Sequence, residues 1–162
     1  MRVAILDDYQ GVAAGMADWS QLPQGAEVQF FRDHLADEER LVERLQEFQV
    51  VMGMRERTPF RRSLLARLPQ LRLLITSGGR NASFDLAAAT EMGIVVCGTG
   101  GAGEGATELT WALILGLLRQ IPQEDQRTRQ GKWGTTVGIG LKGKTLGLLV
   151  LGLSIVANLL IT

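Results

Sequence analysis

The sequence has very little cysteine and histidine, and it carries no net charge. Cys97 is its only cysteine and His34 its only histidine among 162 residues. One thiol cannot form an intrachain disulfide or a cysteine-ligated metal cluster, and a single cysteine suits a reducing cytoplasm. Seventeen basic residues balance seventeen acidic ones, so no positive field indicates binding to nucleic acid or anionic lipid. We therefore expect a cytoplasmic protein with no metal site and no nucleic-acid or membrane partner.

The first hundred residues alternate short apolar runs with amphipathic segments. The apolar runs predict five strands at residues 3–6, 27–31, 50–54, 71–76 and 94–97. The amphipathic segments predict crossover helices at residues 37–48, 60–68 and 83–92. Asp37 and Ser83 are the expected N-caps of the first and third helices. This alternation indicates an α/β fold with a doubly wound parallel sheet in three layers.

A different pattern follows the last predicted strand. A glycine-rich segment at residues 98–105 precedes a long helical pattern at 106–130, which Pro122 should kink. A glycine hinge followed by a long helix is typical of a connection between two domains. Residues 131–143 then predict a loop, and residues 145–151 the first strand of a second domain. We therefore expect one domain at 1–100, and an inter-domain helix with the start of a second domain at 101–162.

Five motifs give the chain a family resemblance. They are RERTP at 55–59, ITSGGRNASFD at 75–85, TELTWAL at 107–113, QGKW at 130–133 and LKGKTLG at 141–147. In this order they resemble the D-isomer-specific 2-hydroxyacid dehydrogenases, which include D-3-phosphoglycerate and glycerate/hydroxypyruvate enzymes. The resemblance implies a flavodoxin-like substrate domain, followed by the start of a Rossmann domain that binds NAD across a cleft. It also implies NAD-dependent oxidation of the CH–OH group of small D-2-hydroxy acids, or reduction of the 2-oxo acids.

Two predicted strand ends carry the candidate substrate-binding residues. Arg55 follows the third strand, and the loop after the fourth strand contains Ser77, Gly78, Gly79 and Arg80. Small residues beyond a parallel strand expose backbone N–H groups to an anion, and a guanidinium can bind a carboxylate through two hydrogen bonds. The resemblance implies that these positions meet the substrate carboxylate. The alternative is that the glycines only make a tight turn and that Arg55 only solvates a strand end.

The last residues depart from the dinucleotide fingerprint of the family. Gly152 matches one of its three glycines and is the candidate cofactor-binding residue, but Val150 and Ile155 stand where the other two belong. The catalytic arginine, glutamate and histidine of the family have no counterpart in the chain. We expect a truncated or frame-altered product, or an isolated domain, that binds nucleotide poorly and has no catalytic residues and no turnover by itself. His34 is expected in a surface loop and Cys97 as a buried structural thiol.

Two further classes of function compete with the enzyme. The chain could be a non-catalytic module that binds a small carboxylate or dimerises. A C-terminal membrane anchor is the third class, because residues 145–162 include no charge. The apolar residues of 106–130 and 145–151 would pack against the rest of a nucleotide domain. Without that domain these apolar residues would be exposed, which predicts that two chains associate as a homodimer.

Overall fold

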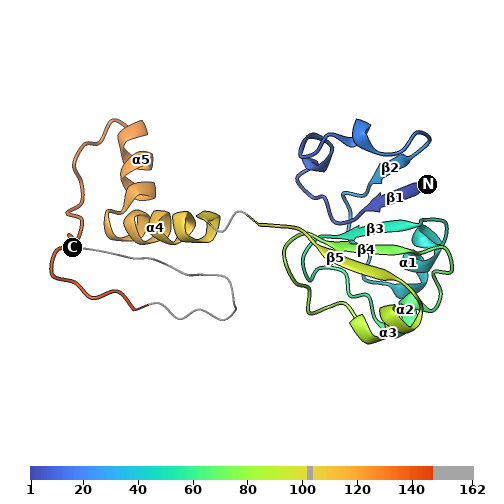
Figure 1. The fold of residues 1–162 in the computed structure, drawn as a ribbon. Coiled ribbons are helices and arrows are strands. Elements are labelled where there is room, and N and C mark those ends of the chain that lie inside the picture. The colour runs from blue at the N-terminus through green and yellow to red at the C-terminus, as the bar shows by residue number, and fades with distance from the viewer. Residues whose placement is uncertain (102–103, 148–162) are drawn as a thin grey trace. The chain divides into compact units, whose positions relative to one another are not determined.

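The chain forms two compact units, Met1–Gly101 and Ala102–Thr162 (Figure 1). We call them the N-terminal unit and the C-terminal unit. The computed structural model describes residues 1–101 and 104–147. The N-terminal unit contains a five-stranded sheet, and the described part of the C-terminal unit contains two helices.

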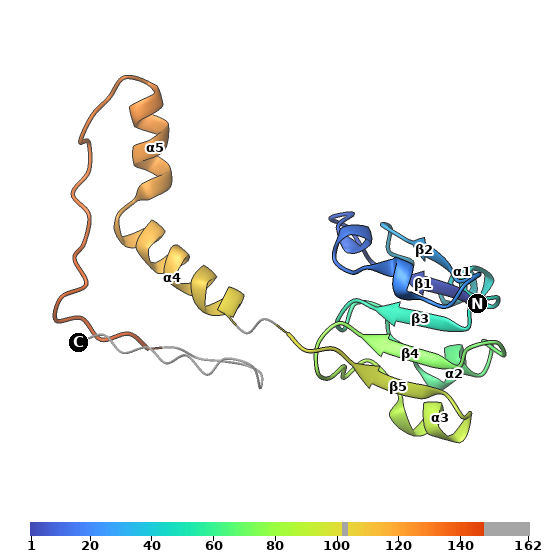
Figure 2. The same ribbon diagram turned by 45° about the horizontal axis from the view of Figure 1, so that its top comes forward.

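The sheet is parallel throughout, and its strand order is β2-β1-β3-β4-β5, as Figure 2 shows. The strands are β1 (Arg2–Ile5), β2 (Glu27–Phe30), β3 (Val50–Gly53), β4 (Leu73–Thr76) and β5 (Val95–Gly98). Their register aligns one apolar row across the sheet, formed by Val28, Val3, Val50, Leu73 and Val95. The parallel α/β sheet predicted from the sequence is confirmed, with strand limits shifted by one or two residues.

The connections place different elements on the two faces of the sheet. The path from β1 to β2 runs in one direction, and every later connection runs in the other, so right-handed crossovers put the first connection on the opposite face. That first connection holds two 3-10 turns, η1 (Ala13–Gly15) and η2 (Trp19–Gln21). The later connections hold α1 (Glu38–Leu45), α2 (Arg62–Leu65) and α3 (Leu86–Glu91). These helices share one large apolar core with Ala4, Val51 and Leu74 of the strands.

The helix caps confirm one sequence prediction and correct another. Asp37 caps α1, because its Oδ1 accepts a hydrogen bond from the backbone N–H of Arg40 at 3.1 Å. Ser83 does not cap α3. Asp85 does, accepting from the N–H of Ala88 at 2.9 Å. A parallel bridge between Phe60 and Phe84 keeps the chain extended past Ser83, so the helix begins two residues after the bridge.

Cys97 is exposed, so the prediction of a buried structural thiol is wrong. Cys97 pairs with Ile75 in β4, whose side chain packs on the face opposite the three helices. Cys97 belongs to β5, which lies at the edge of the sheet. An edge strand has a neighbour on one side only, which leaves its side chains less covered.

The predicted helix at 106–130 is interrupted. The structure has α4 (Glu104–Leu118) and α5 (Ile121–Arg129), separated at Gln120, whose φ of 51° is left-handed. Pro122 lies in the first turn of α5, where its missing N–H leaves no hydrogen bond unmade. The break is therefore set by the left-handed residue, and the proline stabilises the start of the next helix.

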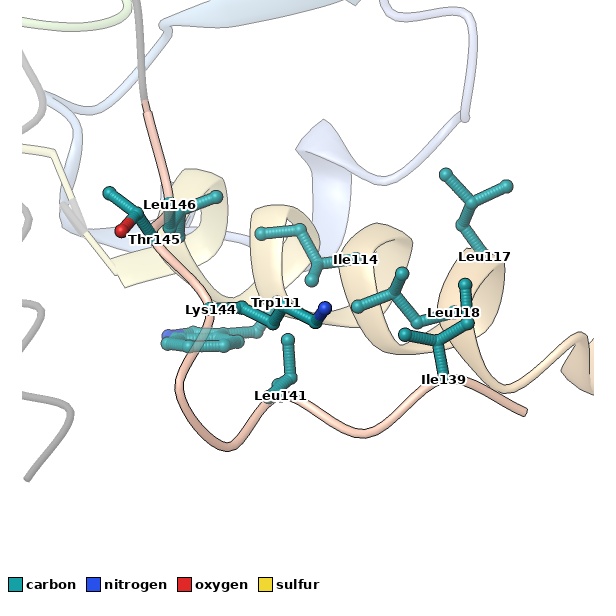
Figure 3. Close-up of a pocket in the computed structure, with 9 residues that line it drawn as sticks. All are labelled: Trp111, Ile114, Leu117, Leu118, Ile139, Leu141, Lys144, Thr145 and Leu146. Atoms are coloured by element: carbon teal, nitrogen blue, oxygen red, sulfur yellow. The ribbon is translucent and has the colours of Figure 1, made fainter.

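The segment after α5 folds back along the helices. The N–H of Ile139 donates to the carbonyl oxygen of Leu118 at 2.8 Å, and the hydroxyl of Thr136 donates to Glu124 at 2.6 Å. Figure 3 shows Ile139 and Leu141 opposite Trp111 and Leu118 of α4, around a cavity of about 330 Å³. The C-terminal unit thus has its own small apolar centre.

Two sequence predictions fall largely beyond this segment. Residues 145–147 do not form a strand. The rest of the predicted strand at 145–151 lies outside the described residues, as does Gly152. Within the described ranges, no helix is both long enough and apolar enough to cross a bilayer.

Candidate functional site

The candidate site lies where the carboxyl ends of β1, β3 and β4 meet at one edge of the sheet. In the order β2-β1-β3-β4-β5 the chain changes direction beside β1, and ligands of such sheets bind at this switch point. Three loops come together there: residues 7–9, 54–58 and 77–83. The candidate residues Arg55, Ser77, Gly78, Gly79 and Arg80 all belong to the second and third loops.

Two hydrogen bonds hold the main chain of Arg55. Its φ of 54° lies in the left-handed region, which is uncommon for a residue with a side chain. Its N–H donates to Oγ of Ser77 at 3.1 Å, and its carbonyl oxygen accepts from Nδ2 of Asn81. The guanidinium extends over Gly78, because a Cβ at Gly78 would collide with Nη1 of Arg55 and lie 3.6 Å from Cζ. The structure therefore brings Arg55, Ser77 and Gly78 together.

Gly78 cannot be replaced by a larger residue without strain. Its φ of +108° favours glycine, and the Arg55 side chain fills the space where a Cβ would project. Gly98 of β5 supports the same loop from the other side, since a Cβ there would approach the carbonyl oxygen of Gly78 to 2.6 Å. The positive φ and the Arg55 side chain explain Gly78, and close backbone approach explains Gly98.

The N–H groups of the loop divide into used and available donors. The N–H of Ser77 donates to the carbonyl of Gly53 at 3.1 Å, and that of Gly78 donates to Oγ1 of Thr99 at 2.9 Å. Those of Gly79 and Arg80 donate to no acceptor among residues 1–101 and 104–147. Only the second half of the predicted loop therefore offers backbone donors to an anion.

Ser77 and Arg80 differ from Arg55 in how they contribute. The Ser77 hydroxyl accepts from the N–H of Arg55 and donates to Sδ of Met54 at 3.1 Å. Its hydrogen bonds fix the loop that carries Arg55. Arg80 lines a cavity of about 560 Å³ beside Cys97, whereas Ser77 lines a different groove of about 740 Å³ with Met54. Arg80 and Ser77 thus line different hollows.

Asp7 is a buried carboxylate at the carboxyl ends of the strands, and it was not predicted from the sequence. Asp7 is 1% exposed and has a φ of 57°. Its Oδ1 lies 2.8 Å from Nδ1 of His34, and its Oδ2 accepts from the hydroxyl of Thr58 at 2.7 Å. His34 is in an exposed loop after β2, as predicted, yet its ring contacts this buried acid. The only local signal was an acidic pair placed directly after a buried strand.

Comparisons with known proteins show the family of the chain. The model of the D-isomer specific 2-hydroxyacid dehydrogenase catalytic domain matches residues 3–146. The D-3-phosphoglycerate dehydrogenase of Homo sapiens is 36% identical over 117 residues, which are 70% of this chain and 22% of that protein. The glyoxylate reductase of Aeropyrum pernix is 35% identical over 99 residues, which are 55% of this chain and 30% of that protein.

A solved structure extends the likeness over nearly all of the chain. The crystal structure of a phosphoglycerate oxidoreductase from Vibrio cholerae is 38% identical, with a TM-score of 0.79. The match covers 94% of this chain and 49% of that one. The chain therefore spans about half of this structure and less than a third of the two curated relatives. On sequence and fold together, this chain belongs to the D-isomer specific 2-hydroxyacid dehydrogenase family.

Proposed function

We propose that this chain supplies the substrate-binding unit of an NAD-dependent oxidoreductase acting on small D-2-hydroxy acids and their 2-oxo counterparts. Relatives named as D-3-phosphoglycerate dehydrogenase and glyoxylate reductase support this class of substrate. One observation carries the proposal: the Arg55 guanidinium extends over Gly78, and the N–H groups of the next two residues, Gly79 and Arg80, have no acceptor among the described residues.

Each of these groups has a defined role toward a carboxylate. The guanidinium supplies a permanent positive charge and two parallel N–H donors that match the two carboxylate oxygens. The N–H groups of Gly79 and Arg80 add donors with no side chain to order. Ser77 and Asn81 hold the Arg55 main chain, so the donors are fixed before the acid arrives.

NAD, when bound, accepts or supplies the hydride in this chemistry. Gly152 matches one glycine of the family fingerprint and is the proposed contact of this chain with NAD. Val150 and Ile155 do not fit that fingerprint, so neither is assigned a part in binding NAD. The sole histidine, His34, is hydrogen-bonded to Asp7. We therefore expect the 162 residues alone to hold the acid without transferring hydride.

The arrangement of the chain suggests further parts of the proposal. We assign residues 1–100 to a substrate domain and 101–162 to an inter-domain helix and the start of a nucleotide domain. Leu113 and Leu117 of α4 are exposed, which supports a homodimer through this helix. Light scattering at micromolar concentration should give the mass of two chains, and the mass of one chain would contradict it. The exposed free thiol of Cys97 favours a reducing compartment such as the cytoplasm.

The binding proposal is tested by titrating D-glycerate into the 162-residue chain in a calorimeter. The variant Arg55→Gln should weaken binding about tenfold or more, because a charge-assisted hydrogen-bonded pair is lost. Arg61→Gln removes the same charge from an exposed position at the start of α2 and should leave the affinity unchanged. Glycerol, which has no carboxylate, should not bind. Equal losses in both variants would show a general charge effect and contradict the site.

A second function, a carboxylate-binding module without catalysis, is favoured by the engaged state of His34. Absorbance at 340 nm separates the two functions. The 162 residues mixed with NADH and hydroxypyruvate should show no change, and steady oxidation of NADH would contradict the expected inactivity.

A further inference from the structure

The loops after β1, β2 and β3 converge on one buried carboxylate beside the candidate site. Asp7 follows β1, His34 follows β2, and Thr58 follows β3, and the latter two bind the two oxygens of Asp7. A buried carboxylate is tolerated only when its oxygens have hydrogen-bond partners. Asp7 thus joins segments that lie 27 and 51 residues away in the sequence.

The third of these loops is the one that carries Arg55. Thr58 is buried and stands three residues after Arg55. Between them, Arg57 donates from Nη1 to the carbonyl oxygen of Asp7 at 3.0 Å, and its guanidinium lies 4.2 Å from the centre of the Tyr9 ring. Asp7 therefore binds this loop twice, once through its side chain and once through its main chain.

The same loop is held from its other side by the loop after β4. Ser77 accepts from the Arg55 N–H, and Asn81 donates to the Arg55 carbonyl. Arg55 keeps its left-handed φ of 54° between these two sets of contacts. Such a conformation persists when the surroundings over-determine it. Loss of the contacts on one side should free the backbone at Arg55 and let the guanidinium change direction.

We propose that Asp7 is a positioning residue for the carboxylate site, acting through Thr58 on the loop that carries Arg55. It touches no substrate in this arrangement. It sets the backbone of residues 55–58, so that the guanidinium extends over Gly78 and meets the acid beside the N–H groups of Gly79 and Arg80. The inference rests on the proposed binding of a small 2-hydroxy acid at this site.

The test compares matched variants of Thr58 in the full 162-residue chain, with D-glycerate as the ligand and calorimetry as the readout. Thr58→Val keeps the shape and removes the hydroxyl, and it should lower the affinity about tenfold. Thr58→Ser restores a hydroxyl and should bind within about twofold of the unmodified chain. Asp7→Gly removes both acceptor oxygens and tolerates the left-handed conformation, and it should weaken binding as Thr58→Val does.

A stability control separates positioning from a general loss of structure. Ile94→Val trims the large apolar core of the N-terminal unit. Ile94 lies just before β5, at the amino ends of the strands, whereas the site lies at their carboxyl ends. The substitution should lower the unfolding midpoint without changing the affinity. If Thr58→Val does not fold, Asp7→Gly carries the comparison. Unchanged affinity in a folded Thr58→Val or Asp7→Gly chain would overturn the inference and leave the proposed site standing. Absence of binding by the unmodified chain would overturn both.

Discussion

Leu45 and Leu117 are opposite in burial, and they lie in different units of this protein. In the N-terminal unit, Leu45 of α1 is fully buried at 0% exposure. In the C-terminal unit, Leu117 of α4 is 78% exposed, and Trp133 is 88% exposed. The first unit closes its core between a sheet and three helices, whereas the described part of the second lines a cavity beside α4. This difference supports the proposed substrate domain at 1–100 and the proposed contact of α4 with a second copy.

The largest expected effect comes from truncating the same residue type in the two units. Leu45→Ala should lower the free energy of unfolding by about 3 kcal/mol, because it leaves a cavity in a closed core. Leu117→Ala should change it by less than about 0.5 kcal/mol at concentrations low enough for the proposed dimer to dissociate. Urea unfolding followed by circular dichroism measures both. Similar losses in the two variants under these dilute conditions would contradict the exposure of Leu117 in the single chain, and the comparison of the two units would fail.

A smaller effect is expected from two neighbouring glycines of the candidate site. Gly78→Ala should destabilise the N-terminal unit by about 2 kcal/mol, because φ is +108° and the new methyl group meets Arg55. Gly79→Ala has open space around the added Cβ and should be nearly neutral. Thermal unfolding distinguishes them. Equal melting temperatures would mean that the Arg55 side chain moves aside freely and is not fixed over the loop.

The next effect concerns the start of α3. Asp85→Ala should cost about 1 kcal/mol, because it removes the side-chain acceptor for the Ala88 N–H. Ser83→Ala, at the position that the sequence suggested as the cap, should cost less than about 0.5 kcal/mol. Chemical denaturation of both variants decides between the two caps. A larger loss in Ser83→Ala would contradict the observed helix start.

The smallest effect is the response of the N-terminal unit to acid. A hydrogen bond from Arg67 lowers the pKa of Glu39 below its ordinary value of 4.5, and one from Arg62 does the same for Glu91. A lowered pKa stabilises the fold above 4.5, and this contribution is lost as the pH falls through the folded-state value. The urea midpoint should therefore decline slightly below about pH 4.5. Arg67→Gln should flatten that decline, and an unchanged acid limb would contradict the pairing.

The strands could be predicted because their signal is local. Near-continuous runs of Val, Ile, Leu and Met, such as 50–54, mark buried strands without knowledge of their neighbours. The cap at Asp37 was visible for the same reason. Ser83 was wrongly predicted as the cap of α3, because the bridge between Phe60 and Phe84 that delays the helix is a tertiary contact. The break at Gln120 was likewise hidden, since glutamine carries no strong signal for a left-handed φ.

The residues of the candidate site also fall into those with a local signal in the sequence and those that depend on tertiary contacts. Arg55 and the loop 77–80 follow strands at predictable places, so the sequence could name them. It could not separate the engaged N–H groups of Ser77 and Gly78 from the available ones of Gly79 and Arg80, because the acceptors come from Gly53 and Thr99. Asp7 was missed because its partners, His34 and Thr58, are distant in the sequence.

Amide chemical shifts of the ¹⁵N-labelled chain test most directly whether the N-terminal unit holds the acid. Spectra are recorded while D-glycerate is added. We predict that the largest shifts belong to the backbone amides of Gly79 and Arg80, with Leu117 and Trp133 in the C-terminal unit unchanged. Saturating shifts confined to the C-terminal unit, or no saturating shifts at Gly79 and Arg80, would contradict a carboxylate site at the carboxyl ends of β3 and β4.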